Sequence, residues 1–142
     1  MPELPEVEIH RERLNRACRG LTLRRLDIID NTRFEGSPTE IEGATILRWR
    51  RRAKYLIADL SSGWSLLSHL GMTGQWLVNP QGQRSHQRIS LIFEGSTTIV
   101  LIDPRRFGWT WIVPTESLED HPRLKSLALE PDDRRMTPDY LH

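Results

Sequence analysis

The sequence predicts an α+β protein, an antiparallel β-sandwich flanked by helices, with the first helix at the N-terminus. Apolar residues recur at helical spacing before a glycine that suits a helix end: Val7, Leu14, Ala17 and Cys18, followed by Gly20. Short apolar runs separated by turn residues then follow one another from residue 21 to residue 113. Several short strands at regular spacing are typical of a sandwich or barrel.

The expected elements follow in order along the chain. A helix is predicted from Pro2 or Glu3 to Arg19, with prolines and glutamates in its first turn. A short hairpin is expected at residues 61–63, a second at residues 94–95, and a longer loop begins at residues 79–82. Thr115 is expected to cap a short helix that starts at Glu116. The expected strands are residues 21–29, 44–51, 55–60, 64–70, 88–93, 97–102 and 107–113.

Composition limits the class of protein. A length of 142 residues, with 37% hydrophobic and 27% charged residues, fits one soluble globular domain. We expect the domain proper to end near residue 130 and residues 131–142 to begin a linker. The single cysteine, Cys18, excludes an internal disulfide and is expected to be a buried thiol. No apolar run is long enough to span a bilayer and the first residues do not resemble a signal peptide, so we expect a cytoplasmic protein.

Charge is unevenly distributed although the net charge is only +1. Residues 48–54 carry four arginines and a lysine, Arg105 and Arg106 form a second basic cluster, and acidic residues gather after position 116. One basic cluster is often a solvated strand face. Two clusters beside apolar side chains that can be exposed favour a polyanionic partner.

The N-terminus offers a nucleophile. Loss of Met1 would leave Pro2 with a free secondary amine, which can attack an electrophilic sugar carbon and form an iminium. Glu3 is adjacent and Glu6 lies one turn away, so either carboxyl group can move protons there. If Met1 is retained, the Pro2 nitrogen is an amide and cannot react. From these residues alone, an ordinary helix start with acidic residues in its first turn is the better explanation of the pattern.

Four segments resemble, in the same order, motifs of the formamidopyrimidine-DNA glycosylases, bacterial enzymes that excise oxidised purines. They are residues 1–8 (MPELPEVE), residues 51–56 (RRAKYL), residues 69–74 (HLGMTG) and residues 103–108 (DPRRFG). The second is similar to the family's lysine-bearing hairpin, and the last two are similar to its intercalation loops. The resemblance thus covers most of the chain.

The resemblance implies a role for each matching residue. Pro2 would be the nucleophile, Glu3 the general acid, Glu6 a supporting carboxylate and Lys54 a phosphate contact. Met72 and Phe107 would fill the gap left by a flipped nucleotide, while Arg105 faces the orphaned base. Arg88 stands where the family has the second histidine of a His-x-His segment. The implied DNA-binding residues are His69, Met72, His86, Arg88, Arg105, Arg106 and Phe107.

The implied activity is that of a bifunctional glycosylase and abasic-site lyase acting on 8-oxoguanine and formamidopyrimidines in double-stranded DNA, by β,δ-elimination. We expect a monomer without a metal or cofactor in this chain. The family's helical domain and its zinc finger, which carries a structural zinc, are not in the sequence, so we expect weak DNA binding and little cleavage.

Two alternatives stay open. An endonuclease VIII type would prefer oxidised pyrimidines but usually has glycine where this chain has Leu4. A noncatalytic DNA-binding module would keep the fold without the chemistry. Residues 127–131 (LALEP) also depart from the family's usual LGPEP at the expected domain junction.

Overall fold

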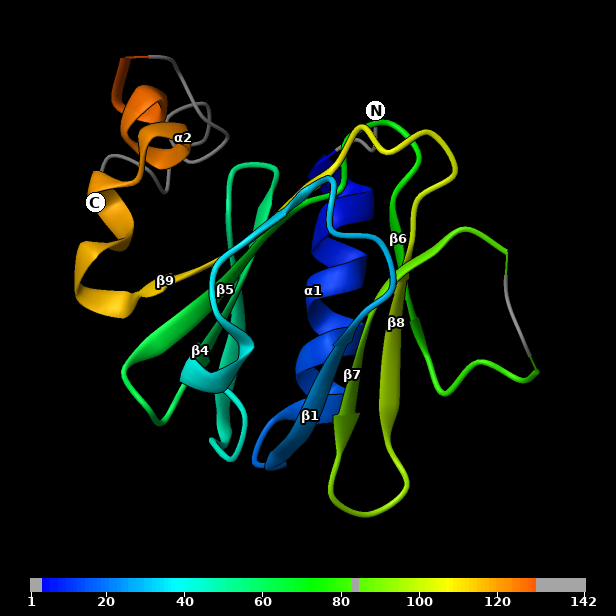
Figure 1. Cartoon of the computed structure of the whole chain (residues 1–142). Helices are drawn as coiled ribbons and strands as arrows, with labels where there is room; N and C mark the ends of the chain where they lie inside the picture. Colours follow the sequence, from blue (N-terminus) through cyan, green and yellow to red (C-terminus); the bar gives the residue numbers. More distant parts are fainter. Residues whose placement is uncertain (1–3, 83–84, 130–142) are drawn as a thin grey trace.

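The computed structural model describes residues 4–82 and 85–129 and contains two β-sheets and an N-terminal helix (Figure 1). This confirms the predicted α+β class. Pro2, Glu3 and the expected linker at residues 131–142 lie outside the described residues. No helix in the described part of the chain is long and apolar enough to cross a membrane.

Helix α1 (Leu4–Cys18) packs through one apolar face. Its buried residues are Val7, Leu14 and Cys18, whose spacing places them on the same side of the helix. This face lies against the edge strands of both sheets, β3 (Ile46–Arg52) and β6 (Gln75–Val78). The buried Cys18 thiol confirms the prediction, and burial raises its pKa to about 12.

The two sheets differ in strand direction. The first sheet has the order β1 (Leu23–Ile28), β7 (Gln87–Phe93), β8 (Thr98–Ile102), β6, and all its pairs are antiparallel. The second sheet has the order β2 (Phe34–Glu35), β9 (Trp109–Pro114), β5 (Trp64–His69), β4 (Tyr55–Leu60), β3. Strand β2 runs parallel to β9, so this sheet is mixed rather than purely antiparallel.

Two strands were not predicted from the sequence. Strand β2 has only two residues, and it reaches β9 because Gly36 has no side chain. A Cβ atom at Gly36 would lie 2.7 Å from the Ile112 Cβ. Strand β6 follows a glycine-containing loop and is held by Trp76, which is fully buried and packs edge-on against Trp49 with ring centroids 5.9 Å apart. Both strands are too short for an alternating pattern to reveal them.

The segment after β9 covers the outer face of the second sheet. It consists of η2 (Thr115–Asp120), α2 (Pro122–Lys125) and η3 (Ser126–Leu129). Elsewhere in the chain, the short helix η1 (Pro38–Glu40) precedes β3. Leu118 and Leu124 from this segment are buried against Tyr55, Ile57, Leu67 and Trp111.

The predicted cap at Thr115 is wrong. Pro114 occupies the cap position of η2, and no side chain forms a capping hydrogen bond there. The Thr115 hydroxyl instead lies 2.7 Å from the Ser65 hydroxyl on β5. The sheet therefore supplied a hydrogen-bonding partner that the local sequence could not indicate.

Candidate nucleic-acid interface

The register of the second sheet brings three distant segments to one edge. Tyr55 pairs with His69, and His69 pairs with Trp109. The β3–β4 hairpin tip that carries Lys54 therefore lies beside the end of β5 and the start of β9. In Figure 1 this edge and the N-terminal end of α1 lie toward the same end of the molecule. Glu6 is exposed in the first turn of that helix.

The loops that follow β5 and precede β9 pack backbone against backbone. Gly71 has φ +64°, and a Cβ atom there would lie 2.6 Å from the carbonyl carbon of Phe107. A Cβ atom at Gly108 would lie 2.5 Å from the carbonyl oxygen of His69. Only glycine permits approaches this close. The two predicted insertion loops thus form one unit, which we call the paired loops (residues 70–74 and 103–108).

Asp103 ties the paired loops together. Its Oδ1 accepts a hydrogen bond from the Thr73 hydroxyl at 2.7 Å, and its Oδ2 accepts one from the Gly108 amide at 2.9 Å. The residue is only 3% exposed. A buried carboxylate with both oxygens satisfied gives the loops a defined relative position.

Met72 and Phe107 project from the paired loops into solvent. Their exposed fractions are 53% and 48%, whereas most large apolar residues of the chain are buried. Exposure of both side chains is what the gap-filling role implied by the resemblance requires. Neighbouring apolar side chains held out of the core by a rigid loop pair suit insertion between stacked bases.

His69 is a neutral imidazole at this edge. Its Nδ1 accepts a hydrogen bond from the Gly71 amide at 3.1 Å, so the ring hydrogen is on Nε2. Its ring lies 4.8 Å from that of Tyr55. Burial, together with the nearby cations of Arg123 and Lys54, lowers the pKa of His69 to about 4.

This shift predicts a contribution of His69 to acid sensitivity. Because the folded pKa lies below the usual 6.5, the unfolded chain binds more protons between pH 6.5 and pH 4, and stability falls as pH falls through that window. As pH falls from 6.5 to 4, the free energy of unfolding should decrease less in His69→Gln than in the parent protein. The expected difference is on the order of 1 kcal/mol. Denaturant unfolding at several pH values measures it. His86→Gln, at an exposed position, is the control, and identical profiles for His69→Gln and the parent would refute the assignment.

The remaining predicted contacts occupy different settings. Arg105 is exposed and forms no ion pair with any residue that the structure describes. His86 is exposed with φ +64°, and its carbonyl accepts from the Asp103 amide at 3.0 Å. Arg88 is turned inward and hydrogen-bonded, and Arg106 is half-exposed and ion-paired to Asp30.

The first basic cluster is largely matched by carboxylates. Arg48 and Arg50 both bind Asp59, at 3.1 and 2.7 Å. Arg51 binds Glu8 at 3.0 Å, which ties β3 to α1, and Arg52 binds Glu119. Much of this positive charge is therefore used in ion pairs within the protein. For these arginines, this favours a structural strand face over a site for a polyanion. Lys54 at the hairpin tip is the member of the cluster that the sheet register places beside the paired loops.

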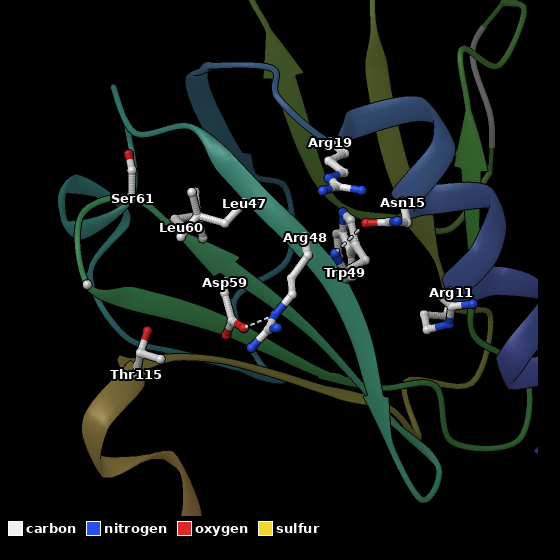
Figure 2. A pocket seen from close by; sticks show the side chains of 11 residues that line it. Arg11, Asn15, Arg19, Leu47, Arg48, Trp49, Asp59, Leu60, Ser61 and Thr115 are labelled. Carbon is white, nitrogen blue, oxygen red and sulfur yellow. Dashed lines mark hydrogen bonds and ion pairs between the residues drawn. The ribbon is translucent and has the colours of Figure 1, made fainter.

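A cavity of about 730 Å³ lies away from these residues, between α1, β3 and the β4–β5 turn (Figure 2). Its lining includes Arg11, Arg19, Arg48 and Asn15, and none of the predicted site residues. Within the described residues, no group of three or more histidine, cysteine or acidic side chains is placed to hold a metal ion.

Sequence reasoning missed two residues that shape this edge, Asp103 and Asp30. Asp103 belongs to a recognised motif, but nothing in the motif shows that its carboxylate reaches Thr73, 30 positions away. Asp30 lies in a polar loop with no sequence signal at all, and it contacts Arg88 and Arg106.

Comparison with known proteins identifies the same family that the sequence motifs resemble. Residues 1–110 match the model of the formamidopyrimidine-DNA glycosylase N-terminal domain. The chain is 40% identical to the formamidopyrimidine-DNA glycosylase of Rhodopseudomonas palustris (strain BisA53) and 42% identical to that of Cereibacter sphaeroides (strain ATCC 17025). Each match covers 92% of this chain and 51% of the relative, so the chain spans about half the length of these relatives.

Solved structures agree. Lactococcus lactis Fpg (MutM) bound to DNA containing N7-benzyl-Fapy-dG superposes with a TM-score of 0.78 at 27% identity, covering 84% of this chain and 46% of that protein. The same protein with abasic-site DNA gives a TM-score of 0.78 at 26% identity, with the same coverage. Fold, loops and relatives define the N-terminal domain of a DNA glycosylase. The chain belongs to the formamidopyrimidine-DNA glycosylase family.

Proposed function

We propose that this domain carries the active site of a bifunctional DNA glycosylase and abasic-site lyase that removes oxidised purines, 8-oxoguanine and formamidopyrimidines, from double-stranded DNA. The observation that carries the proposal is the exposed pair Met72 and Phe107 on rigid paired loops, beside Lys54 and His69. A structural relative bound to Fapy-dG DNA supports the same substrate class.

The proposed chemistry uses the amine of Pro2. Its nitrogen attacks the sugar C1′, the bond from C1′ to the base breaks, and Glu3 donates a proton to the ring oxygen as the sugar opens. The product is an iminium between Pro2 and C1′. Loss of a proton from C2′ then expels the 3′ phosphate, and δ-elimination expels the 5′ phosphate. Glu6 supports this site, and no metal takes part.

The proposed DNA contacts divide into two groups. Lys54, His69 and His86 act on phosphates, His69 by donating from its neutral Nε2. Met72 and Phe107 fill the space of the extruded nucleotide, and Arg105 presents its guanidinium to the unpaired base, favourably cytosine. The neighbouring helical and zinc-finger parts of longer relatives would enclose the other side of the DNA.

Borohydride trapping tests the proposal. Mass measurement of the N-terminus first identifies preparations in which Pro2 is free. The protein is then incubated with duplexes that contain 8-oxoguanine, thymine glycol or an abasic site. We expect a covalent adduct, because borohydride reduces the iminium to a stable amine, and we expect Pro2→Gly to abolish it.

The controls separate the alternatives. The full-length Rhodopseudomonas palustris relative shows that the duplexes and the reductant support trapping. An adduct of unchanged yield in Pro2→Gly would exclude the proline mechanism. Binding without any adduct would indicate a noncatalytic module, and faster trapping on thymine glycol would indicate the pyrimidine-directed type.

Met72→Ala should reduce trapping on duplex lesions about tenfold or more but spare single-stranded abasic DNA, since no gap needs filling there.

A further inference from the structure

The loop between β1 and β2 contains a fixed carboxylate beside the paired loops. The Oδ1 atom of Asp30 accepts hydrogen bonds from the Thr32 amide at 2.9 Å and the Thr32 hydroxyl at 2.7 Å. The Asp30 amide donates to the Arg88 carbonyl at 3.1 Å. Asp30 is therefore held by its own turn and by β7, and its second oxygen is presented in a defined position.

That second oxygen, Oδ2, lies between two arginines. Arg88 Nη1 donates to it at 3.0 Å, and Arg106 Nε lies 3.4 Å from it. Both arginines also converge on the Asp103 carbonyl, which accepts from Arg88 Nε at 2.9 Å and from the Arg106 amide at 3.3 Å. The side chains of Asp30 and Arg88 are 18% and 17% exposed, so this part of the network is well shielded from water.

Arg106 has a backbone conformation that needs such support. Its φ is +56°, in the left-handed region that side chains other than glycine rarely adopt. It stands between Arg105 and Phe107, the two residues proposed to read and fill the opened DNA. Its backbone angle therefore sets the directions in which both neighbours project.

We propose that Asp30 is a positioning residue for lesion recognition: it holds Arg106 in the left-handed conformation that aims Arg105 and Phe107, and it keeps the Arg88 and Arg106 cations from binding DNA phosphates non-selectively. Arg88 is then a link of this network rather than a DNA contact. The inference rests on the proposed function for its effect on DNA, while the effect on the loop is independent of it.

The test variant is Asp30→Asn, whose amide keeps the size and the Thr32 bonds but removes the charge that faces the two arginines. Asp27→Asn is the matched control, because Asp27 pairs at 2.9 Å with the exposed Arg25 and its loss changes net charge equally. Hydrogen exchange on DNA-free protein should show the Arg106 and Gly108 amides exchanging at least tenfold faster in Asp30→Asn. Exchange equal to that of Asp27→Asn would overturn the inference.

DNA binding gives a readout that simple destabilisation would not produce. Asp30→Asn should bind undamaged duplex two- to fivefold more tightly at low salt, with the log–log salt slope steeper by about one phosphate contact. Its preference for lesion over undamaged duplex should fall about tenfold. A parallel loss of both affinities, or an unchanged preference despite faster exchange, would overturn the recognition role and leave the proline chemistry unaffected.

A double-mutant cycle distinguishes loss of the interaction between Asp30 and Arg106 from general destabilisation of the fold by Asp30→Asn. Arg106→Gly relieves the left-handed strain and removes the ion pair, so adding Asp30→Asn to it should change Gly108 exchange by much less than in the parent background. Additive effects of the two substitutions would contradict the inference.

Discussion

Replacing Gly71 by alanine is expected to lower the free energy of unfolding by about 3 kcal/mol. Two physical costs add. The left-handed φ of +64° is unfavourable for alanine, and the new Cβ would lie 2.6 Å from the Phe107 carbonyl carbon and 2.7 Å from the Gly108 nitrogen. Because both clashing atoms belong to the backbone, no side-chain rotation relieves the overlap. The paired loops must separate, so binding of lesion DNA should weaken as well.

Gly82 provides a matched control for this prediction. Its φ is +67°, but a Cβ atom there would have no atom of the described residues within 4 Å. Gly82→Ala should therefore cost only the conformational part, about 1 kcal/mol. Chemical denaturation of both variants gives the difference directly. Equal losses would mean that the contact between the loops is not tight.

Asp103→Ala should cost about 3 kcal/mol and disconnect the paired loops. The substitution leaves the Gly108 amide without its acceptor in a buried position and removes the partner of the Thr73 hydroxyl. Losing charged acceptors from buried donors is among the more costly single changes. Met72 and Phe107 would then lose their fixed separation, and we expect lesion binding to fall more than binding of undamaged duplex.

Asp103→Asn separates the hydrogen bonds from the charge. The asparagine oxygen can accept from the Gly108 amide, while its amino group donates to the Thr73 hydroxyl, which is able to accept. This variant should lose about 1 kcal/mol and keep most of its lesion preference. Thermal and denaturant unfolding, together with binding to duplexes with and without 8-oxoguanine, measure both effects. A loss in Asp103→Asn as large as in Asp103→Ala would show that charge, not geometry, matters.

Local patterns predicted most of the fold. The buried positions of α1 recur at helical spacing, and turn residues between apolar runs indicate the hairpins β4–β5 and β7–β8. What local patterns missed depends on tertiary contacts. Strand β6 exists because Trp76 packs against Trp49, and β2 exists because Gly36 lets it approach β9.

The candidate site divides in the same way. Motifs identified Lys54, His69, Met72 and Phe107, and the sheet register brings these four to one edge. The residues that hold them, Asp103 and Asp30, were not identified because their partners are distant in sequence. Arg88 lies 58 positions from Asp30, and only the pairing of β1 with β7 makes them neighbours.

The covered outer face of the second sheet limits how far the domain can be shortened. Strand β9 is an interior strand, and Trp111, Ile112, Leu118 and Leu124 all lie beyond residue 110, where the match to the family model ends. A chain trimmed to residue 110 would lose most of β9, leave one edge of β5 unpaired and bare the apolar side of β4. Such an edge invites strand exchange between molecules and aggregation. The smallest autonomously folding unit therefore extends beyond the matched region, through Leu124 at least.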